Sequence, residues 1–205
     1  YYNRGALVKE SIRSLLDQSY EDLEIIAVDD GSTDDTLARL QSFRDRRLRV
    51  VTHANRGFTA SIIEAVRLAS GELIAVHGSG DYSYPERIRR QAELLRARPD
   101  VGVVGCLVEN VNLLTGRKTI YGKLDDTEPA LPQLLRGNVF THGEVMFRRT
   151  VYEAAGGYRP LFKYSQDYDL WLRMAPLAGF ALVREVLYRR YTQPDGVSAS
   201  AEKRI

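Results

Sequence analysis

Short apolar runs alternate with helix-like segments through the first part of the chain, and this alternation constrains the fold more than any other feature. Apolar runs of strand length are predicted over 23–28, 48–52 and 72–77. Apolar residues at helical spacing precede or separate these runs, over 7–16, 37–43 and 60–69. Strands that alternate with helices in this way indicate an α/β fold, in which a mostly parallel sheet is flanked by helices on both faces.

Turn motifs that contain acidic residues follow the first and third predicted strands. The first is Asp29-Asp30-Gly31-Ser32 and the second is Gly78-Ser79-Gly80-Asp81. Ligands of open α/β sheets bind at the carboxyl ends of the strands, so the two loops are expected to be neighbours at a binding site. Taken alone, Asp-Gly-Ser is also common in turns and helix caps.

The second half of the chain loses this alternation. A long β-rich segment is predicted over 101–111, a polar and turn-rich segment over 118–126, and a small strand over 143–147. Helical patterns follow the polar segment and the small strand, over 131–135, 150–155 and 166–175. No internal repeat or linker divides the chain, so we predict one domain over 1–205, whose second half covers the sheet edge and carries substrate contacts.

The charge and cysteine content exclude several classes of function. The 205 residues include 29 Lys and Arg and 27 Asp and Glu, a balance that does not provide the basic surface needed for a nucleic-acid partner. The single cysteine, Cys106, cannot form an internal disulfide or a multi-cysteine zinc site, and it is expected to be a small core residue in a cytoplasmic protein. No apolar run is long enough to span a bilayer, so membrane contact would need segments outside this sequence.

An ordered set of motifs points to one family. The set is Tyr2-Asn3, Val28-Asp29-Asp30-Gly31-Ser32-Thr33-Asp34, Asn55-Arg56-Gly57, Ala69-Ser70-Gly71-Glu72, Asp81 with Pro85-Glu86-Arg87, Val145-Met146-Phe147-Arg148-Arg149, Gly156-Gly157-Tyr158 and Gln166-Asp167-Tyr168-Asp169-Leu170-Trp171-Leu172-Arg173. In order and spacing it resembles the family 2 glycosyltransferases, which are inverting enzymes of the GT-A fold that use nucleotide-diphospho-sugars. The resemblance implies a nucleotide-binding half over 1–100 and an acceptor and catalytic half over 101–205.

The resemblance also bears on the start of the chain and on the nucleotide. The family usually opens with a buried strand that ends in Pro-x-Tyr-Asn, and only the Tyr2-Asn3 end is present, so a first strand is expected to be missing. By family correspondence Asp30 accepts the imide N–H of uracil, Tyr2 packs beside the base, and Asp81 lies near the ribose or diphosphate. A helix-capping role for Asp30 is the alternative.

The family correspondence makes Asp167 the general base that removes the proton of the acceptor hydroxyl. A carboxylate suits this task because it is ionised at neutral pH while it is aimed at one hydroxyl. The alternative is an acid that only favours the start of its helix. His142, Asp169 and Trp171 are expected on the acceptor side, although Trp171 could equally be a core residue and His142 a structural one.

The family's metal-binding acids are largely replaced. Those positions fall on Gly78, Gly80 and Asp81, so Asp81 is the one acid that could bind the Mg²⁺ or Mn²⁺ that the resemblance implies. Tyr191-Thr192-Gln193 also lacks the histidine that many members have in this segment. Glycine removes both the oxygen ligand and its negative charge.

Three accounts of the function follow. The chain could transfer a sugar from a donor, UDP-linked by expectation, to a saccharide or lipid-linked acceptor, with Arg189, Arg190 or a cation on Asp81 neutralising the leaving diphosphate. It could bind a nucleotide or sugar without transfer, or keep the fold only as an interaction module. An unrelated nucleotidyltransferase would need at least two metal-binding acids in one cluster. The presence of Asp167 favours transfer, because a chain freed from catalysis need not keep a base.

Overall fold

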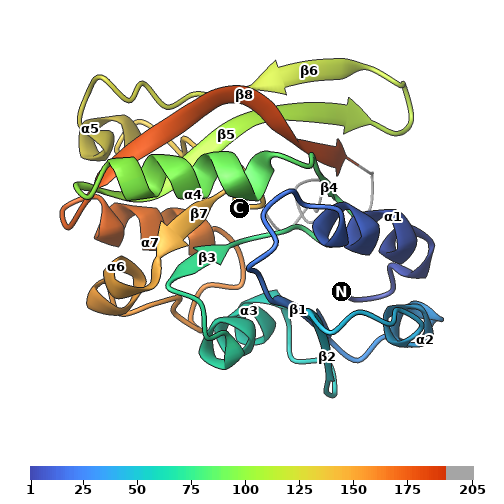
Figure 1. Cartoon of the computed structure of the whole chain (residues 1–205). Helices are drawn as coiled ribbons and strands as arrows, with labels where there is room; N and C mark the ends of the chain where they lie inside the picture. The colour runs from blue at the N-terminus through green and yellow to red at the C-terminus, as the bar shows by residue number, and fades with distance from the viewer. Residues whose placement is uncertain (193–205) are drawn as a thin grey trace.

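The computed structural model describes residues 1–192 and shows a central mixed sheet flanked by helices (Figure 1). Its helices are α1 (Gly5–Leu16), α2 (Thr36–Gln41), α3 (Phe58–Leu68), α4 (Arg87–Ala97), α5 (Ala130–Leu134), α6 (Arg149–Ala154) and α7 (Gln166–Met174). Its strands are β1 (Ile25–Asp29), β2 (Leu48–Thr52), β3 (Leu73–Ala75), β4 (Tyr82–Ser83), β5 (Val101–Asn112), β6 (Lys118–Tyr121), β7 (Met146–Arg148) and β8 (Gly179–Thr192). Gln193, the last residue of the segment that lacks a histidine, lies outside the described residues.

The first half folds as its hydrophobic periodicity predicts. In α1 the apolar side of the helix buries Val8 and Ile12, which pack with Ala27 of β1 and Leu40 of α2 in one core cluster. β1 is buried at four of its five positions, as a short continuous apolar strand should be. β1 and β2 pair in parallel, and the predicted α/β class with a helix-flanked sheet is confirmed.

The direction of the other strands departs from the expected mostly parallel sheet. A six-stranded sheet has the order β3-β7-β5-β8-β4, with β6 paired to β5. Within it β5 and β8 pair in parallel, whereas the β3–β7, β5–β7, β5–β6 and β4–β8 pairs are antiparallel. These antiparallel pairs form either through a tight hairpin, as between β5 and β6, or between strands that are far apart in the sequence, as between β3 and β7.

The second half builds the middle of the large sheet and does not only cover its edge. β5, β7 and β8 are its inner strands, and β8 pairs with β5 along most of its length. Part of the segment expected to be polar and turn-rich forms β6, which folds back onto β5 through a tight turn closed by the Asn112 N–H on the Arg117 carbonyl (2.9 Å). The sequence did not predict β6 as a strand, because its residues are mostly exposed and include polar side chains.

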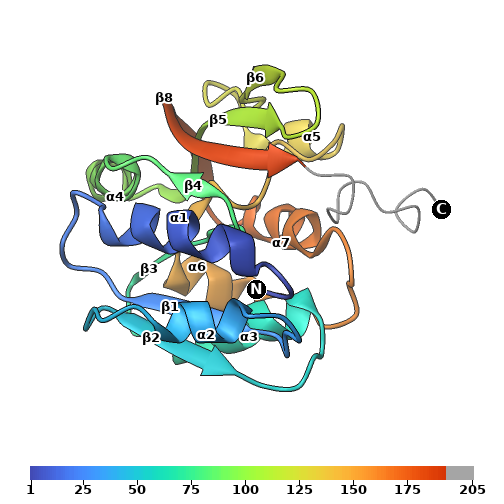
Figure 2. The ribbon, with the colours of Figure 1, turned by 90° about the vertical axis from the view of Figure 1, so that its right-hand side faces the viewer.

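Helices cover both faces of this sheet (Figures 1 and 2). On one face Ala92 and Leu95 of α4 pack with Val104 and Cys106 of β5. On the other face α5, α6 and α7 pack against alternate residues of the same strands, including Val103. Cys106 is buried in the core, as expected.

The N-terminal residue pairs with β1 on the side away from β2. The Tyr1 ammonium donates to the Val28 carbonyl (2.6 Å), and the Asp30 N–H donates to the Tyr1 carbonyl (2.8 Å). This is the hydrogen-bond pattern of neighbouring parallel strands. The strand expected before Tyr1 stays a prediction. Within residues 1–192, no helix combines the length and the apolar character that crossing a bilayer requires.

Candidate active site

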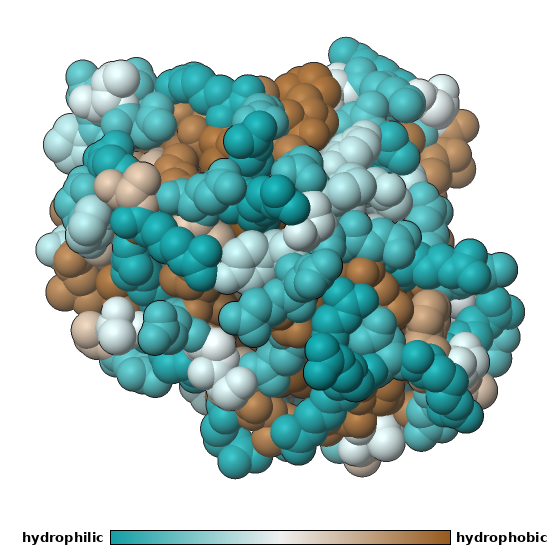
Figure 3. Space-filling view, in the orientation of Figure 1, coloured by the Kyte–Doolittle hydropathy of each residue, from teal (hydrophilic) through white to brown (hydrophobic). Residues whose placement is uncertain are grey.

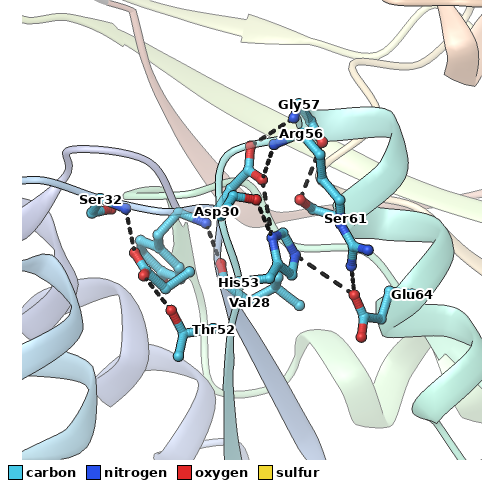
Figure 4. Close-up of polar contacts among 12 residues, drawn as sticks. Val28, Asp30, Ser32, Thr52, His53, Arg56, Gly57, Ser61 and Glu64 are labelled. Atoms are coloured by element: carbon cyan, nitrogen blue, oxygen red, sulfur yellow. Dashed lines mark hydrogen bonds and ion pairs between the residues drawn. The ribbon is translucent and has the colours of Figure 1, made fainter.

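Asp30 ties the end of β1 to the loop that follows β2. Its Oδ1 accepts the Arg56 N–H (3.0 Å) and its Oδ2 accepts the Gly57 N–H (2.9 Å). Figure 4 shows the Asp30 carboxylate pointing at these two groups. Asp30 therefore does not cap a helix, because the side chain that receives the N–H of Thr36 at the start of α2 is Asp34. Since a carboxylate has about four lone-pair sites, Asp30 keeps accepting capacity for a nucleotide base.

A charged network behind Asp30 went unrecognised in the sequence. The His53 ring lies between two carboxylates, with Nδ1 3.4 Å from Asp30 Oδ1 and Nε2 3.6 Å from Glu64 Oε2 (Figure 4). The Arg56 guanidinium pairs with Glu64. This network fixes the loop whose backbone holds Asp30. The only local signal for it was the Asn55-Arg56-Gly57 turn.

Asn3 holds the acidic turn in place, and Tyr2 stands next to it. Asn3 Oδ1 accepts the Thr33 N–H (2.8 Å), while the Asn3 N–H donates to Ser32 Oγ (3.0 Å). The Tyr2 side chain is 50% exposed, which leaves its ring free to pack beside a base. Tyr1 instead points inward, where its hydroxyl contacts Ser11 Oγ (2.8 Å) and burial raises its pKa to about 12.

Asp81 is fastened to β8. The Tyr188 hydroxyl donates to Asp81 Oδ2 (2.7 Å), and the Tyr191 N–H donates to Asp81 Oδ1 (3.1 Å). The same Tyr188 oxygen accepts the Gly78 N–H (2.8 Å), so one hydroxyl bonds to the first and the last residue of the loop over 78–81. Burial raises the pKa of the Asp81 carboxyl, and these hydrogen bonds oppose that rise. Asp81 therefore acts as a link between the Gly-Ser-Gly loop and the last strand.

Buried side chains hold this loop from below. The Arg87 guanidinium donates to the Val76 carbonyl (2.7 Å) and to Ser83 Oγ (2.9 Å), and it lies over the Tyr188 ring. His77 contacts Ser83 Oγ through Nδ1 (3.1 Å), and burial lowers its pKa to about 3. A neutral His77 therefore supports the loop at physiological pH.

The residues of this loop do not fit a divalent cation. A Cβ at Gly78 would lie 2.2 Å from Asp81 Oδ2 and 3.1 Å from the Tyr188 hydroxyl. Gly80 has φ +94°, and its Cβ would lie 2.6 Å from Leu7 Cδ1. An acid at either position would require Asp81 or Leu7 to move, so Asp81 is the one carboxylate that this loop offers. No group of three His, Cys, Asp or Glu residues in the described part of the chain could hold a metal ion.

Replacing Gly78 by Ala is expected to lower the free energy of unfolding by about 1–3 kcal/mol, because the new Cβ displaces the Asp81 carboxylate. In an Asp81→Ala background the same change should cost less than about 1 kcal/mol, since the obstructing oxygen is gone. Urea denaturation of the four proteins of this double-mutant cycle, followed by circular dichroism, measures both costs. Equal costs in the two backgrounds would show that the clash with Asp81 does not limit position 78.

Asp167 lies in the first turn of α7 and is held by Asn138. The Asn138 Nδ2 amide donates to Asp167 Oδ2 (2.9 Å), and the Tyr121 hydroxyl donates to the Asn138 carbonyl (3.4 Å). In the described part of the chain Oδ1 of Asp167 has no hydrogen-bond partner, and the residue is only partly buried. Nothing in the sequence linked Asn138 to Asp167, because the pair is 29 residues apart.

His142 lies under Asp167 in a ring of aromatic side chains. Its Nε2 lies 2.7 Å from the Tyr158 hydroxyl, and Phe58 and Trp171 contact the ring edge to face. Burial lowers the pKa of His142, while the charge of Asp167 opposes that fall. A side chain that is buried in this way supports the floor of the site, whereas its predicted contact with the acceptor stays a prediction.

Asp169 and Trp171 point away from the cleft. Asp169 is 8% exposed and pairs with Arg159 and Arg173, which anchors α7 to the preceding loop. Trp171 is completely buried and packs against Phe140 and Phe147. The structure thus does not support the predicted acceptor contacts of these two residues, because helical geometry turns them into the core while Asp167 stays at the surface.

Residues 1–156 match the sequence model of the family described as Glycosyl transferase family 2. The chain belongs to this family. The Bacillus subtilis (strain 168) protein named as glycosyltransferase EpsE is 31% identical in an alignment 201 residues long, which covers 92% of this chain and 69% of EpsE. Escherichia coli chondroitin synthase is 25% identical in an alignment 205 residues long, which covers 96% of this chain and 29% of that synthase.

Solved structures show the same GT-A fold. Staphylococcus aureus TarS in complex with UDP-GlcNAc has a TM-score of 0.78 at 19% identity, over 98% of this chain and 59% of the TarS chain. The mannosyltransferase PcManGT from Pyrobaculum calidifontis, in complex with GDP-Man and Mn²⁺, has a TM-score of 0.74 at 21% identity, over 97% of this chain and 57% of that chain. This family 2 domain thus spans only part of the length of these proteins.

The family 2 fold brings the predicted residues into two groups. Asp30, Tyr2 and Asn3 cluster at the ends of β1 and β2, and Asp167 with Asn138 and His142 forms the second group at the start of α7. Asp81 is hydrogen-bonded to Tyr188 and so joins the Gly-Ser-Gly loop to β8. The first group thus holds a carboxylate fixed by two backbone N–H groups, and the second holds a partly buried carboxylate fixed by a side-chain amide.

Proposed function

We propose that this domain moves a sugar from a nucleotide-diphospho-sugar, of the UDP type, to a hydroxyl of a saccharide or lipid-linked acceptor with inversion at the anomeric carbon. The observation that carries the proposal is Asp167, whose Oδ2 accepts the Asn138 amide while Oδ1 has no hydrogen-bond partner within residues 1–192. A base held at one oxygen and open at the other is aimed at a single proton. Polysaccharide or glycoconjugate synthesis in the cytoplasm is the setting we infer.

The proposed step is a single displacement. The acceptor oxygen attacks the anomeric carbon and forms the new glycosidic bond, while its proton passes to Asp167 Oδ1. The bond between the anomeric carbon and the diphosphate oxygen breaks, and its electron pair stays on the diphosphate. Attack from the face opposite the leaving group inverts the configuration. Asn138 positions Asp167 throughout, and His142 and Tyr158 support the site from below.

Nucleotide recognition is assigned to the turn after β1. Asp30 is fixed by two backbone N–H groups and keeps lone pairs for an imide N–H, and Tyr2 offers an exposed ring next to the turn. The complexes of TarS with UDP-GlcNAc and of PcManGT with GDP-Man support a nucleotide-sugar donor, since both proteins share this fold.

A domain that binds nucleotide without transfer is the second candidate, favoured by the glycines that replace the family's acids. Calorimetric titration with UDP, GDP and dTDP tests nucleotide binding, and a hydrolysis assay with UDP-GlcNAc and other UDP-sugars tests turnover. We expect UDP to bind and at least one UDP-sugar to be hydrolysed slowly. Binding without any turnover would support the second candidate, and the absence of any nucleotide binding would overturn both.

A further inference from the structure

The last strand places two neighbouring arginines on opposite faces of the sheet. Arg189 points away from Asp81: its Nε donates to Glu109 and its Nη2 donates to the Tyr84 hydroxyl (2.7 Å). Arg190 shares the face of Tyr188, because residues two apart on a strand point to the same side. The structure therefore separates two cations that the sequence could not tell apart, and only one of them lies on the side that holds Asp81.

Arg190 lies in an open polar hollow on that face. Its Nε donates to Asn110 Oδ1 (2.9 Å), whereas its terminal nitrogens make no hydrogen bond to any described residue. The hollow has a volume of about 410 Å³, and its lining consists of Asn110, Asn112, Arg117, Thr119, Arg190 and Thr192. Hydroxyl, amide and guanidinium groups are the donors that bind phosphate oxygens, and none of the residues within 1–192 that line the hollow is a carboxylate.

The charge of Arg190 affects the pKa of a residue in each part of the candidate site, Asp81 and Tyr121. It lowers the pKa of Asp81, against the larger effect of burial, and it likewise opposes the rise in the pKa of Tyr121. Tyr121 in turn bonds to the Asn138 carbonyl, and Asn138 holds Asp167. Arg190 also precedes Tyr191, whose N–H bonds to Asp81, and a donor diphosphate would sit near it if the proposed function is correct.

A leaving diphosphate needs a positive partner at this point. As the bond to the sugar breaks, negative charge grows on the departing phosphate oxygen, and a fixed cation stabilises that charge. The Gly-Ser-Gly loop offers a divalent cation a single carboxylate, because Gly78 and Gly80 carry no acid and Asp81 is hydrogen-bonded to Tyr188 and Tyr191. The planar guanidinium presents its donors in a rigid fork that matches two phosphate oxygens, whereas an ammonium is a compact point charge.

Resting on the proposed function, we propose that Arg190 binds the donor diphosphate and neutralises the leaving group in place of a divalent cation. The domain then binds its nucleotide donor without metal. Because the neutralising charge belongs to the protein, donor binding should not change when a chelator removes divalent ions. Transfer should depend on Arg190 more strongly than binding does, since the charge on the diphosphate is greatest in the transition state.

The test is calorimetric titration of the protein with UDP and with uridine at fixed ionic strength, in EDTA and in Mn²⁺. Wild type should bind UDP with affinities that agree within about threefold in the two buffers. Arg190→Gln should weaken UDP binding by about 10- to 100-fold and leave uridine binding unchanged. Arg190→Lys should fall between the two, because it keeps the charge and loses the fork.

Two matched variants remove the same charge elsewhere on β8. One variant is Arg184→Gln: the Arg184 side chain is 63% exposed and pairs with Asp126. The other is Arg189→Gln: Arg189 lies on the face of the sheet opposite Arg190 and bonds to Glu109. Both should bind UDP within about twofold of wild type. Melting temperatures of all variants show whether each is folded. If Arg190→Gln does not fold, the UDP affinity of Arg190→Lys still tests the role of Arg190.

Three outcomes would contradict the proposals, and each contradicts a different part of them. UDP binding by wild type that requires Mn²⁺ would overturn the metal-free site while leaving the proposed transferase intact. Equal UDP affinity for folded Arg190→Gln and wild type would overturn the role of Arg190. Failure of wild type to bind any nucleotide in either buffer would instead overturn the proposed function itself.

Discussion

Replacing Asp167 by Asn is expected to lower the rate of sugar transfer by about 10²- to 10⁴-fold, the usual contribution of general base catalysis. Asparagine has nearly the same shape but cannot accept the proton of the acceptor hydroxyl. UDP affinity should stay within about threefold of wild type, because Asp167 contacts Asn138 and lies away from the turn that holds Asp30. Initial rates with a UDP-sugar and calorimetric titration with UDP measure the two quantities.

A matched control for this substitution is Asp22→Asn, at an exposed position between α1 and β1. It removes the same charge and should leave both rate and affinity unchanged. A transfer rate for Asp167→Asn within a few fold of wild type would exclude Asp167 as the base. In that case the acid would only stabilise the first turn of α7, an effect of about 0.3–1 kcal/mol.

Replacing Trp171 by Ala is expected to lower the free energy of unfolding by about 3–5 kcal/mol, the typical cost of removing a large buried aromatic side chain. The Trp171 ring is fully buried between Phe140, Phe147 and His142. Such a loss is a large part of the stability of a typical domain, about 5–15 kcal/mol. Because Trp171 is the one tryptophan of the chain, unfolding should be followed by circular dichroism and not by fluorescence.

The milder substitution Trp171→Phe separates packing from sugar binding. Within the described residues the Trp171 Nε1 is buried without a hydrogen-bond partner, so phenylalanine removes no polar contact and should cost clearly less than alanine. Its activity should approach that of wild type. A Trp171→Ala protein that melts like wild type but has a raised KM for the acceptor would restore the predicted stacking of Trp171 on a sugar.

The sequence predicted the first half well because each element there has one strong period. Leu48–Thr52 was predicted at its exact bounds, since a short strand pattern between two turns leaves little choice. The strand β7 pairs antiparallel with β3, and the paired residues, such as Ala75 and Met146, lie far apart in the sequence. Local patterns contain no information on such pairing, so the antiparallel half of the sheet was not anticipated.

In the candidate site too, the sequence predicted the local turns but not the contacts between distant residues. The motif around Asp30 indicated the correct turn, but the contact of Asp30 with Gly57 depends on the loop after β2. The Gly-Ser-Gly segment indicated lost ligands, whereas the bond from Tyr188 to Asp81 spans 107 residues. Sequence reasoning identified which residues were unusual, and only the fold shows what each of them contacts.

The fastening of Asp81 to Tyr188 has a consequence for the history of this domain. A Cβ at position 78 would meet Asp81 and Tyr188, and a Cβ at position 80 would meet Leu7, so an acid at either position requires its neighbours to move. Restoring aspartate at positions 78 and 80 should therefore give an insoluble or weakened protein and no metal dependence. In an alignment of related domains, we expect glycine at 78 and tyrosine at 188 to be inherited together. That pair would mark a metal-free lineage more reliably than the missing acids alone.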